Sequence, residues 1–179
     1  GIDASIRPLF QDALINNLDL NNGAGLNLSI QGVVPNVKYA VKVWSYNADN
    51  AFYPTPTQFG PRSGSDTTGT TESIVQFAAP LPVSLNDYST TIIVSSTTST
   101  LDIHAASTQN QNGNAYGGTR FNAFQLSLAG DYNGDSRVDA ADYVIWRKTD
   151  GTPAGYNVWR SNFGAVLGMG SGNLLGSAI

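Results

Sequence analysis

The chain has 179 residues, of which 12% are charged, and carries a net charge of −4. This acidic balance, with no basic stripe to meet phosphates, excludes nucleic acid as a partner. The absence of cysteine excludes disulfides and thiolate metal sites, and no apolar run is long enough to span a bilayer. A chain of this length has room for one sizeable domain and a small one.

Residues 1–129 have the pattern of an all-β domain. Apolar and polar residues alternate in short runs rich in Thr, Val and Ile, and turn signals separate these runs every dozen or so residues. This spacing favours a β-sandwich, with helix limited to a turn near residues 9–14. The expected strands are residues 26–30, 39–46, 73–77, 90–94, 100–104 and 120–128.

Two segments resemble galactose-binding-type jelly rolls. Leu28 to Tyr46 combines an apolar strand, a Pro-Asn turn and a Tyr-x-Val-x-Val-Trp strand, as in the central hairpin of those domains. The run Phe121-Asn-Ala-Phe-Gln-Leu is similar to their closing strand, with Ala123 in place of a common Gly. The resemblance implies a jelly-roll-like sandwich that serves as a carbohydrate-binding or adhesive module without catalytic residues.

Long polar loops are expected at residues 47–59, 64–71 and 109–118. Sugar sites combine an aromatic platform with planar amide and carboxylate groups, and the loops offer both kinds of side chain. The alternative is that the loop aromatics pack onto the edge of the sandwich. The candidate ligand-binding residues are Asp49, Tyr53, Phe59, Asn114 and Tyr116.

The sequence assembles no recognisable active site. His104 is the one histidine, and it lies in an alternating strand, which favours a structural role. No serine lies in a Gly-x-Ser-x-Gly elbow. Asp49 and Asp66 could form the carboxylate pair of a glycosidase, but the sequence does not fix their separation. We therefore expect that the chain is not an enzyme.

Residues 131–142 have the ligand spacing of an EF-hand-type calcium loop. Ca²⁺ takes six to eight oxygen ligands, and this run supplies oxygen-bearing side chains at positions 1, 3, 5, 9 and 12, with the backbone carbonyl at position 7. Without a counter-ion, its four carboxylates would repel one another. The alternative is a surface turn that holds no ion. The expected ligands are Asp131, Asn133, Asp135, Arg137 through its carbonyl, Asp139 and Asp142.

The loop departs from the EF-hand pattern at two positions. Position 6 is Ser136, where Gly usually makes the sharp turn, so we expect Ser in a strained turn conformation. Position 12 is Asp142 rather than Glu, and its shorter carboxylate must sit closer to the ion.

The flanks of the loop differ from those of an ordinary EF-hand. A strand is expected upstream at residues 124–128, and a helix downstream at residues 140–149, with Asp139 as its N-cap and Asp142 in its first turn. This one-sided arrangement, with Asp at position 12, resembles the type I dockerin repeat of secreted bacterial proteins. The resemblance implies a calcium cofactor and a partner such as a cohesin-like protein, although the paired contact residues for cohesin are not recognisable.

A second copy of the unit follows without an acidic loop. Tyr143-Val-Ile-Trp-Arg147 recurs as Tyr156-Asn-Val-Trp-Arg160, and each copy places Tyr and Trp on one helical face. Residues 151–153 separate the copies and Gly164 closes the second. The resemblance covers residues 130–164 and implies one calcium site. The expected small core between the two helices consists of Tyr143, Trp146, Tyr156, Trp159 and Phe163.

The predicted organisation is a sandwich domain (1–129), a dockerin-like helix pair (130–165) and a flexible tail (166–179). Imperfect calcium ligands suit millimolar extracellular calcium, and the chain begins with Gly1 rather than Met, so we expect a processed, secreted or cell-surface protein. The first functional hypothesis is a non-catalytic recognition protein for a polysaccharide or a surface protein. The alternatives are a structural subunit that self-associates into a filament or surface layer, and the C-terminal part of a larger secreted glycoside hydrolase.

Overall fold

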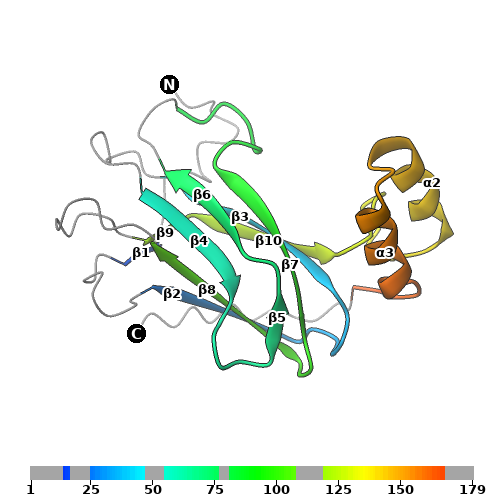
Figure 1. The fold of residues 1–179 in the computed structure, drawn as a ribbon, viewed down its shortest axis with the longest axis horizontal. Coiled ribbons are helices and arrows are strands. Elements are labelled where there is room, and N and C mark those ends of the chain that lie inside the picture. The colour runs from blue at the N-terminus through cyan, green and yellow to red at the C-terminus, as the bar shows by residue number, and fades with distance from the viewer. Residues whose placement is uncertain (1–13, 17–24, 47–54, 77–80, 108–118, 168–179) are drawn as a thin grey trace.

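The computed structural model describes residues 14–16, 25–46, 55–76, 81–107 and 119–167. This part of the chain is mainly β, with two four-stranded antiparallel sheets, one two-stranded sheet and a pair of helices. The sheets lie on one side of the molecule and the helix pair projects from the other (Figure 1).

The first sheet has the strand order β2-β8-β4-β6, and the second β10-β3-β7-β5. A short pair, β1-β9, stands beside them. The strands of the first sheet are β2 (Leu26–Gln31), β8 (Thr100–Ser107), β4 (Thr55–Pro61) and β6 (Glu72–Gln76). Those of the second are β10 (Ala123–Leu128), β3 (Tyr39–Trp44), β7 (Ser89–Ser96) and β5 (Thr67–Gly69), and the pair is β1 (Leu14–Asn16) and β9 (Thr119–Phe121).

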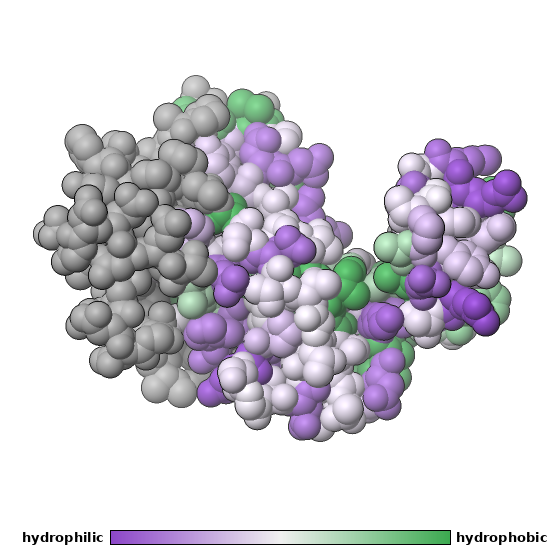
Figure 2. Space-filling model, in the orientation of Figure 1, coloured by the Kyte–Doolittle hydropathy of each residue, from purple (hydrophilic) through white to green (hydrophobic). Residues whose placement is uncertain are grey.

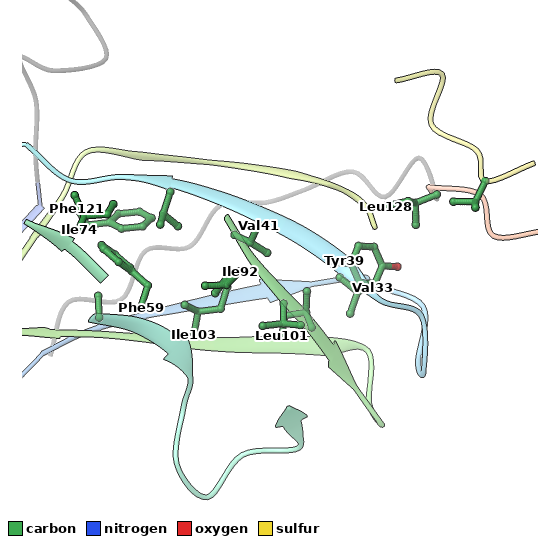
Figure 3. Packing of buried hydrophobic residues seen from close by; sticks show 14 residues of the cluster. Val33, Tyr39, Val41, Phe59, Ile74, Ile92, Leu101, Ile103, Phe121 and Leu128 are labelled. Carbon is green, nitrogen blue, oxygen red and sulfur yellow. The ribbon is translucent and has the colours of Figure 1, made fainter. Parts of the chain in front are cut away.

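Side chains from both four-stranded sheets meet in one hydrophobic cluster (Figure 3). Alternate residues of β3 face it, because successive side chains of a strand point to opposite faces, and Val41 and Val43 are completely buried. Ile92 of β7 is the partner of Val41 in the same sheet, whereas Leu101 of β8 and Phe59 of β4 come from the other sheet. All three are also completely buried. Burial of one such aliphatic side chain stabilises the fold by about 2 kcal/mol.

Each of the six predicted runs contains a strand, but two predicted loops are wrong. The run 120–128 divides at Asn122 into β9 and β10. Residues 55–59, predicted as loop, belong to β4, and the predicted loop 64–71 contains β5.

The prolines of β4 explain why its sequence does not look like a strand. Proline cannot donate to a sheet ladder and is confined to edges or strand ends. Strand β4 pairs with β6 through residues 55–59 and with β8 through residues 57–61. Pro56 therefore lies beyond the segment paired with β8, and Pro61 lies beyond the segment paired with β6. The offset lets a proline-bearing strand occupy the interior of a sheet.

The helix pair consists of α2 (Ala140–Thr149) and α3 (Pro153–Asn162). Helix α2 has the predicted bounds, and Asp139 caps it by accepting a hydrogen bond from the Ala141 N–H at 2.7 Å. Helix α3 begins after the N-cap Thr152, with Pro153 in its first turn, where the missing N–H is harmless. Helix α3 is the one nearer the sheets (Figure 1).

The helix pair is joined to the sheets through buried residues. Val138, in the loop before α2, is completely buried in the same cluster as the sheet residues, and Trp159 and Leu167 pack against that cluster. Hydrophobic residues gather at the narrow join between the sheets and the helices (Figure 2). The division into domains at residue 130 stays a prediction, but the two parts share one core.

The chain after α3 returns to the loop. Arg137 and Val166 form an isolated antiparallel bridge, and the Leu167 N–H donates to the Ser136 carbonyl at 2.9 Å. The first two residues of the predicted flexible tail are thus paired with the loop, and residues 168–179 lie outside the described part of the chain.

Candidate metal centre

In the candidate calcium loop, residues 131–142, two residues have left-handed backbone, and one of them is the position where the sequence predicts a sharp turn. Ser136 at position 6 has a φ of 70°, and Gly134 at position 4 has a φ of 76°. Left-handed backbone is costly for a residue with a Cβ, so the Ser136 conformation must be held by the contacts around it.

Short side chains of the loop hold this turn through bonds to its own backbone. The two oxygens of Asp131 accept from the N–H groups of Gly134 at 2.7 Å and Ser136 at 2.9 Å. Asn133 Oδ1 accepts from the Asp135 N–H at 2.9 Å, and Asn133 Nδ2 donates to Asp135 Oδ2 at 3.0 Å. These bonds satisfy backbone donors that a tight loop cannot pair within a helix or sheet.

Asp142, at position 12, ties the two ends of the loop together. Its carboxylate is completely buried. Oδ1 accepts from the N–H groups of Tyr132 at 2.8 Å and Asn133 at 3.0 Å, and Oδ2 accepts from the Asp139 N–H at 2.8 Å. The last bond completes a capping box at the start of α2. Hydrogen bonds to a charged group contribute about 2 kcal/mol each, so Asp142 closes the loop from within the protein.

The loop provides oxygens in the calcium spacing, but its carboxylates do not converge on one point. Within the described residues, no three His, Cys, Asp or Glu side chains form a group that could hold a metal ion. A carboxylate has about four lone-pair positions. The bonds of Asp142 use three of them, whereas the bonds of Asp131 use two. A cation at this loop would therefore reach Asp142 through one oxygen unless backbone bonds were released.

Tyr132 supports the other side of the loop. Its hydroxyl donates to Asp150 Oδ2 at 3.2 Å, and Asp150 is the C-cap of α2. Burial, followed by the nearby Asp150 carboxylate, raises the pKa of Tyr132 to about 12. The phenol therefore remains a hydrogen-bond donor at neutral pH.

The aromatic residues of the helix pair contact one another as predicted, but none of them is fully buried. The Tyr143 ring lies 5.3 Å from the Trp146 ring and 5.2 Å from the Trp159 ring, and Tyr156 lies 5.4 Å from Trp146. Phe163 contacts Trp159 at 5.2 Å but is 58% exposed, so it forms the open end of the stack. Such ring contacts add about 1 kcal/mol each to the burial of apolar area.

Two contacts that the sequence did not predict fix α3 to its surroundings. Trp159 Nε1 donates to the Asp139 carbonyl at 2.8 Å, which joins α3 to the end of the loop. Gly130 has a φ of 93°, and a Cβ placed there would lie 2.7 Å from the Trp159 Cα. Only glycine allows this backbone conformation and this close an approach.

Asn162 is the third unpredicted contact, and it joins α3 to the second sheet. Its side chain is buried and accepts from the Lys38 N–H at 3.0 Å. Its amide nitrogen donates to the carbonyls of Lys38 at 2.6 Å and Ala129 at 2.8 Å. No local pattern in the sequence signals a contact between residues 124 positions apart.

The predicted ligand-binding set has one correction. Phe59 was expected as a loop aromatic, but it lies on β4, is completely buried and contacts the Phe121 ring at 6.1 Å. It is therefore a core residue and not part of a sugar platform. Asp49, Tyr53, Asn114 and Tyr116 lie outside the described residues.

His104 lies half-buried on the first sheet, where its Nδ1 is 2.9 Å from Asn27 Oδ1 on the neighbouring strand. Burial, followed by the positive charge of Arg62, lowers the pKa of His104. The backbone of Gly25 lies against the imidazole ring, since a Cβ there would be 2.5 Å from its Cε1 atom. The imidazole thus packs into the surface of the sheet.

The chain matched no protein-family model, no curated protein and no solved structure. Among the described residues, neither helix has the length and apolar character that a bilayer crossing requires.

Proposed function

We propose that this chain is a non-catalytic secreted or cell-surface protein in which a dockerin-like, calcium-binding helix pair is attached to a jelly-roll-like β-sandwich that recognises a polysaccharide or a surface protein. The loop at residues 131–142 is the observation that carries the proposal. It combines oxygen side chains at calcium-ligand spacing with a left-handed Ser136 at the turn position and a capped helix directly after it.

The proposed calcium site leaves the backbone bonds of Asp142 in place. Carboxylates can bind Ca²⁺ through one oxygen or two, and Asp142 keeps one lone-pair position beside its three backbone bonds. Bound calcium would offset the mutual repulsion of the loop carboxylates. The residues that would hold it are Asp131, Asn133, Asp135, Arg137 through its carbonyl, Asp139 and Asp142.

Calcium binding is tested by calorimetric titration of the full chain and its Asp135→Ala variant. Asp135 is chosen because its recorded bonds are local to the loop, to Arg137 and Asn133, so its removal spares the capping box of α2. We expect saturable binding to the unchanged chain and a loss of at least about tenfold in affinity in the variant, which corresponds to about 1.4 kcal/mol.

The matched control is Asp66→Ala, which removes the same charge at an exposed position away from the loop. Its affinity for calcium should equal that of the unchanged chain. Equal affinities in all three proteins, or no heat of binding in any of them, would rule out the loop as a calcium site.

The sandwich is the recognition part of the proposal. The support for a carbohydrate ligand is the clustering of aromatic, amide and carboxylate residues in the sequence at residues 47–54 and 109–118. Binding of the chain to a glycan array should be lost on Tyr53→Ala or Tyr116→Ala and retained on Phe163→Ala, which removes an exposed aromatic from the helix pair. A glycan profile unaffected by the two tyrosine changes would contradict this assignment.

A further inference from the structure

The candidate calcium loop contains the pair Asn133-Gly134, and in a flexible chain the side-chain amide of such an asparagine is chemically labile. Asparagine is thermolabile in proteins, and a following glycine has no Cβ to obstruct attack by its backbone nitrogen. We propose that Asn133 is a deamidation site, and that the closed loop protects it until the loop opens.

The reaction requires only water as a co-reactant. The Gly134 nitrogen loses its proton and forms a bond to the Asn133 Cγ atom, while the side-chain nitrogen leaves as ammonia. Water then opens the resulting cyclic imide at one of its two carbonyls. The products are aspartate and isoaspartate, and no atom is oxidised or reduced.

The hydrogen bonds of the loop oppose the first step at the attacking nitrogen. The Gly134 N–H donates to Asp131 Oδ1 at 2.7 Å. Loss of that proton would place a negative nitrogen beside a carboxylate, and nearby like charges disfavour the charged form of a group. Asp131 therefore keeps Gly134 in its unreactive, protonated state.

The same loop also holds the group under attack, the Asn133 side-chain amide, in place. The Asn133 amide oxygen accepts from the Asp135 N–H at 2.9 Å, and its amide nitrogen donates to Asp135 Oδ2 at 3.0 Å. Both groups of the side chain are thus bonded to residue 135, and rotation toward the Gly134 nitrogen breaks these bonds. Asn133 and Gly134 are exposed to solvent, so access of water does not limit the reaction.

Modification would change the loop in two ways. Aspartate at residue 133 adds a fifth carboxylate to the four already in the loop, whereas isoaspartate inserts an extra backbone carbon between positions 3 and 4. Isoaspartate therefore shifts the side chains at positions 1 and 3 out of step with those at positions 5 to 12.

The test measures conversion at each Asn-Gly pair of the full chain by mass spectrometry of its peptides, after incubation in alkaline buffer with a chelator. The conversion rates at Asn22-Gly23 and Asn112-Gly113 provide reference values within the same chain. We expect Asn133 to convert about tenfold or more slowly in the native chain than in urea, because hydrogen bonds to charged groups must first break. Equal rates in the two conditions would overturn the proposal.

The residue that provides the protection is identified by variants of the native chain. Asp131→Ala should raise the conversion rate of Asn133 by about tenfold. Asp139→Asn also removes a loop charge, but it keeps an oxygen for the α2 cap and leaves the bonds of Asn133 and Gly134 in place, so the rate should not change. An unchanged rate in Asp131→Ala, or an equal increase in Asp139→Asn, would contradict the assigned role.

Two further measurements keep the test decisive. The first is the conversion rate of Asp131→Asn, which retains an oxygen acceptor without the charge and should give an intermediate rate. The second is circular dichroism of each variant, which checks that the sheets remain folded. Since these rates are measured in chelator, they do not depend on the proposed calcium site. In a separate series without chelator, added calcium should slow conversion further. A failure of calcium to do so would count against the calcium site and not against the protection.

Discussion

At the scale of single residues, Asp142 both closes the loop and helps to start the helix that follows it. Its buried carboxylate bonds to three backbone N–H groups and starts α2. These bonds close the loop without an ion, whereas Asp131 and Asp135 keep more of their lone pairs available for one. We therefore place the structural role of the loop mainly at position 12, and in the proposed calcium site the ligand role would fall mainly on positions 1 to 5.

Tyr132 gives a prediction about alkaline stability. Its pKa rises from the ordinary 10.0 to about 12 in the folded protein, so the folded state holds the phenolic proton more tightly than the unfolded state. This contribution to stability is fully present below pH 10.0 and declines as the pH rises through about 12. Urea unfolding across this range should show a steeper loss of stability in the unchanged chain than in Tyr132→Phe, and parallel curves would contradict the prediction.

At the scale of elements, Asn162 attaches the last turn of α3 to the start of β3. Its amide pairs with both the N–H and the carbonyl of Lys38, as a neighbouring strand would, and it also bonds to the Ala129 carbonyl. Removal of the side chain leaves the Lys38 N–H and the Ala129 carbonyl without these bonds, whereas the Lys38 carbonyl still accepts from the Ala129 N–H. Each backbone group left without a partner costs about 1 kcal/mol or more.

Asn162→Ala should therefore lower the free energy of unfolding by about 2 kcal/mol, measured by denaturant titration. Asn157→Ala on the same helix is the control, because Asn157 is exposed and alanine is the better helix former. Its stability should be unchanged or slightly higher. A similar loss in both variants would mean that the hydrogen bonds of Asn162 are not responsible for it.

The elements also show where sequence reasoning succeeded and where it failed. Helix α2 was predicted to the residue because its cap, its acidic first turn and its aromatic spacing are all local. Strand β4 was missed because its prolines are accommodated by an offset between two neighbouring strands, which no single segment reveals. Asn162 was missed for the same reason, since its partners lie on distant parts of the chain.

At the scale of the whole molecule, the helix pair and the sheets depend on one another. Val138 lies between two of the proposed ligands, Arg137 and Asp139, yet it is completely buried in the cluster formed by the sheets. The Val138 N–H donates to the Ala165 carbonyl, and its own carbonyl accepts from the Gly164 N–H. A change in the loop should therefore also affect the stability of the sheets, both through the packing of Val138 and through the backbone.

Val138→Ala should lower the free energy of unfolding of the whole molecule by about 2 kcal/mol. Hydrogen exchange read by mass spectrometry should show the loss of protection in the strands as well as in the helices. Val144→Ala, at a position that is 49% exposed on α2, is the matched control and should have little effect. Faster exchange restricted to residues 130–167 would show that the two parts unfold independently.

Gly130 sets the route by which the chain leaves the sheet for the loop. Any larger residue there would meet the backbone of Trp159 and would also require an unfavourable φ. For protein engineering, this position is the wrong place to cut, lengthen or label the connection, although it stands at an apparent boundary between two modules. Transplanting the helix pair onto another scaffold would need to carry Gly130, together with an acceptor for Asn162, as part of the graft.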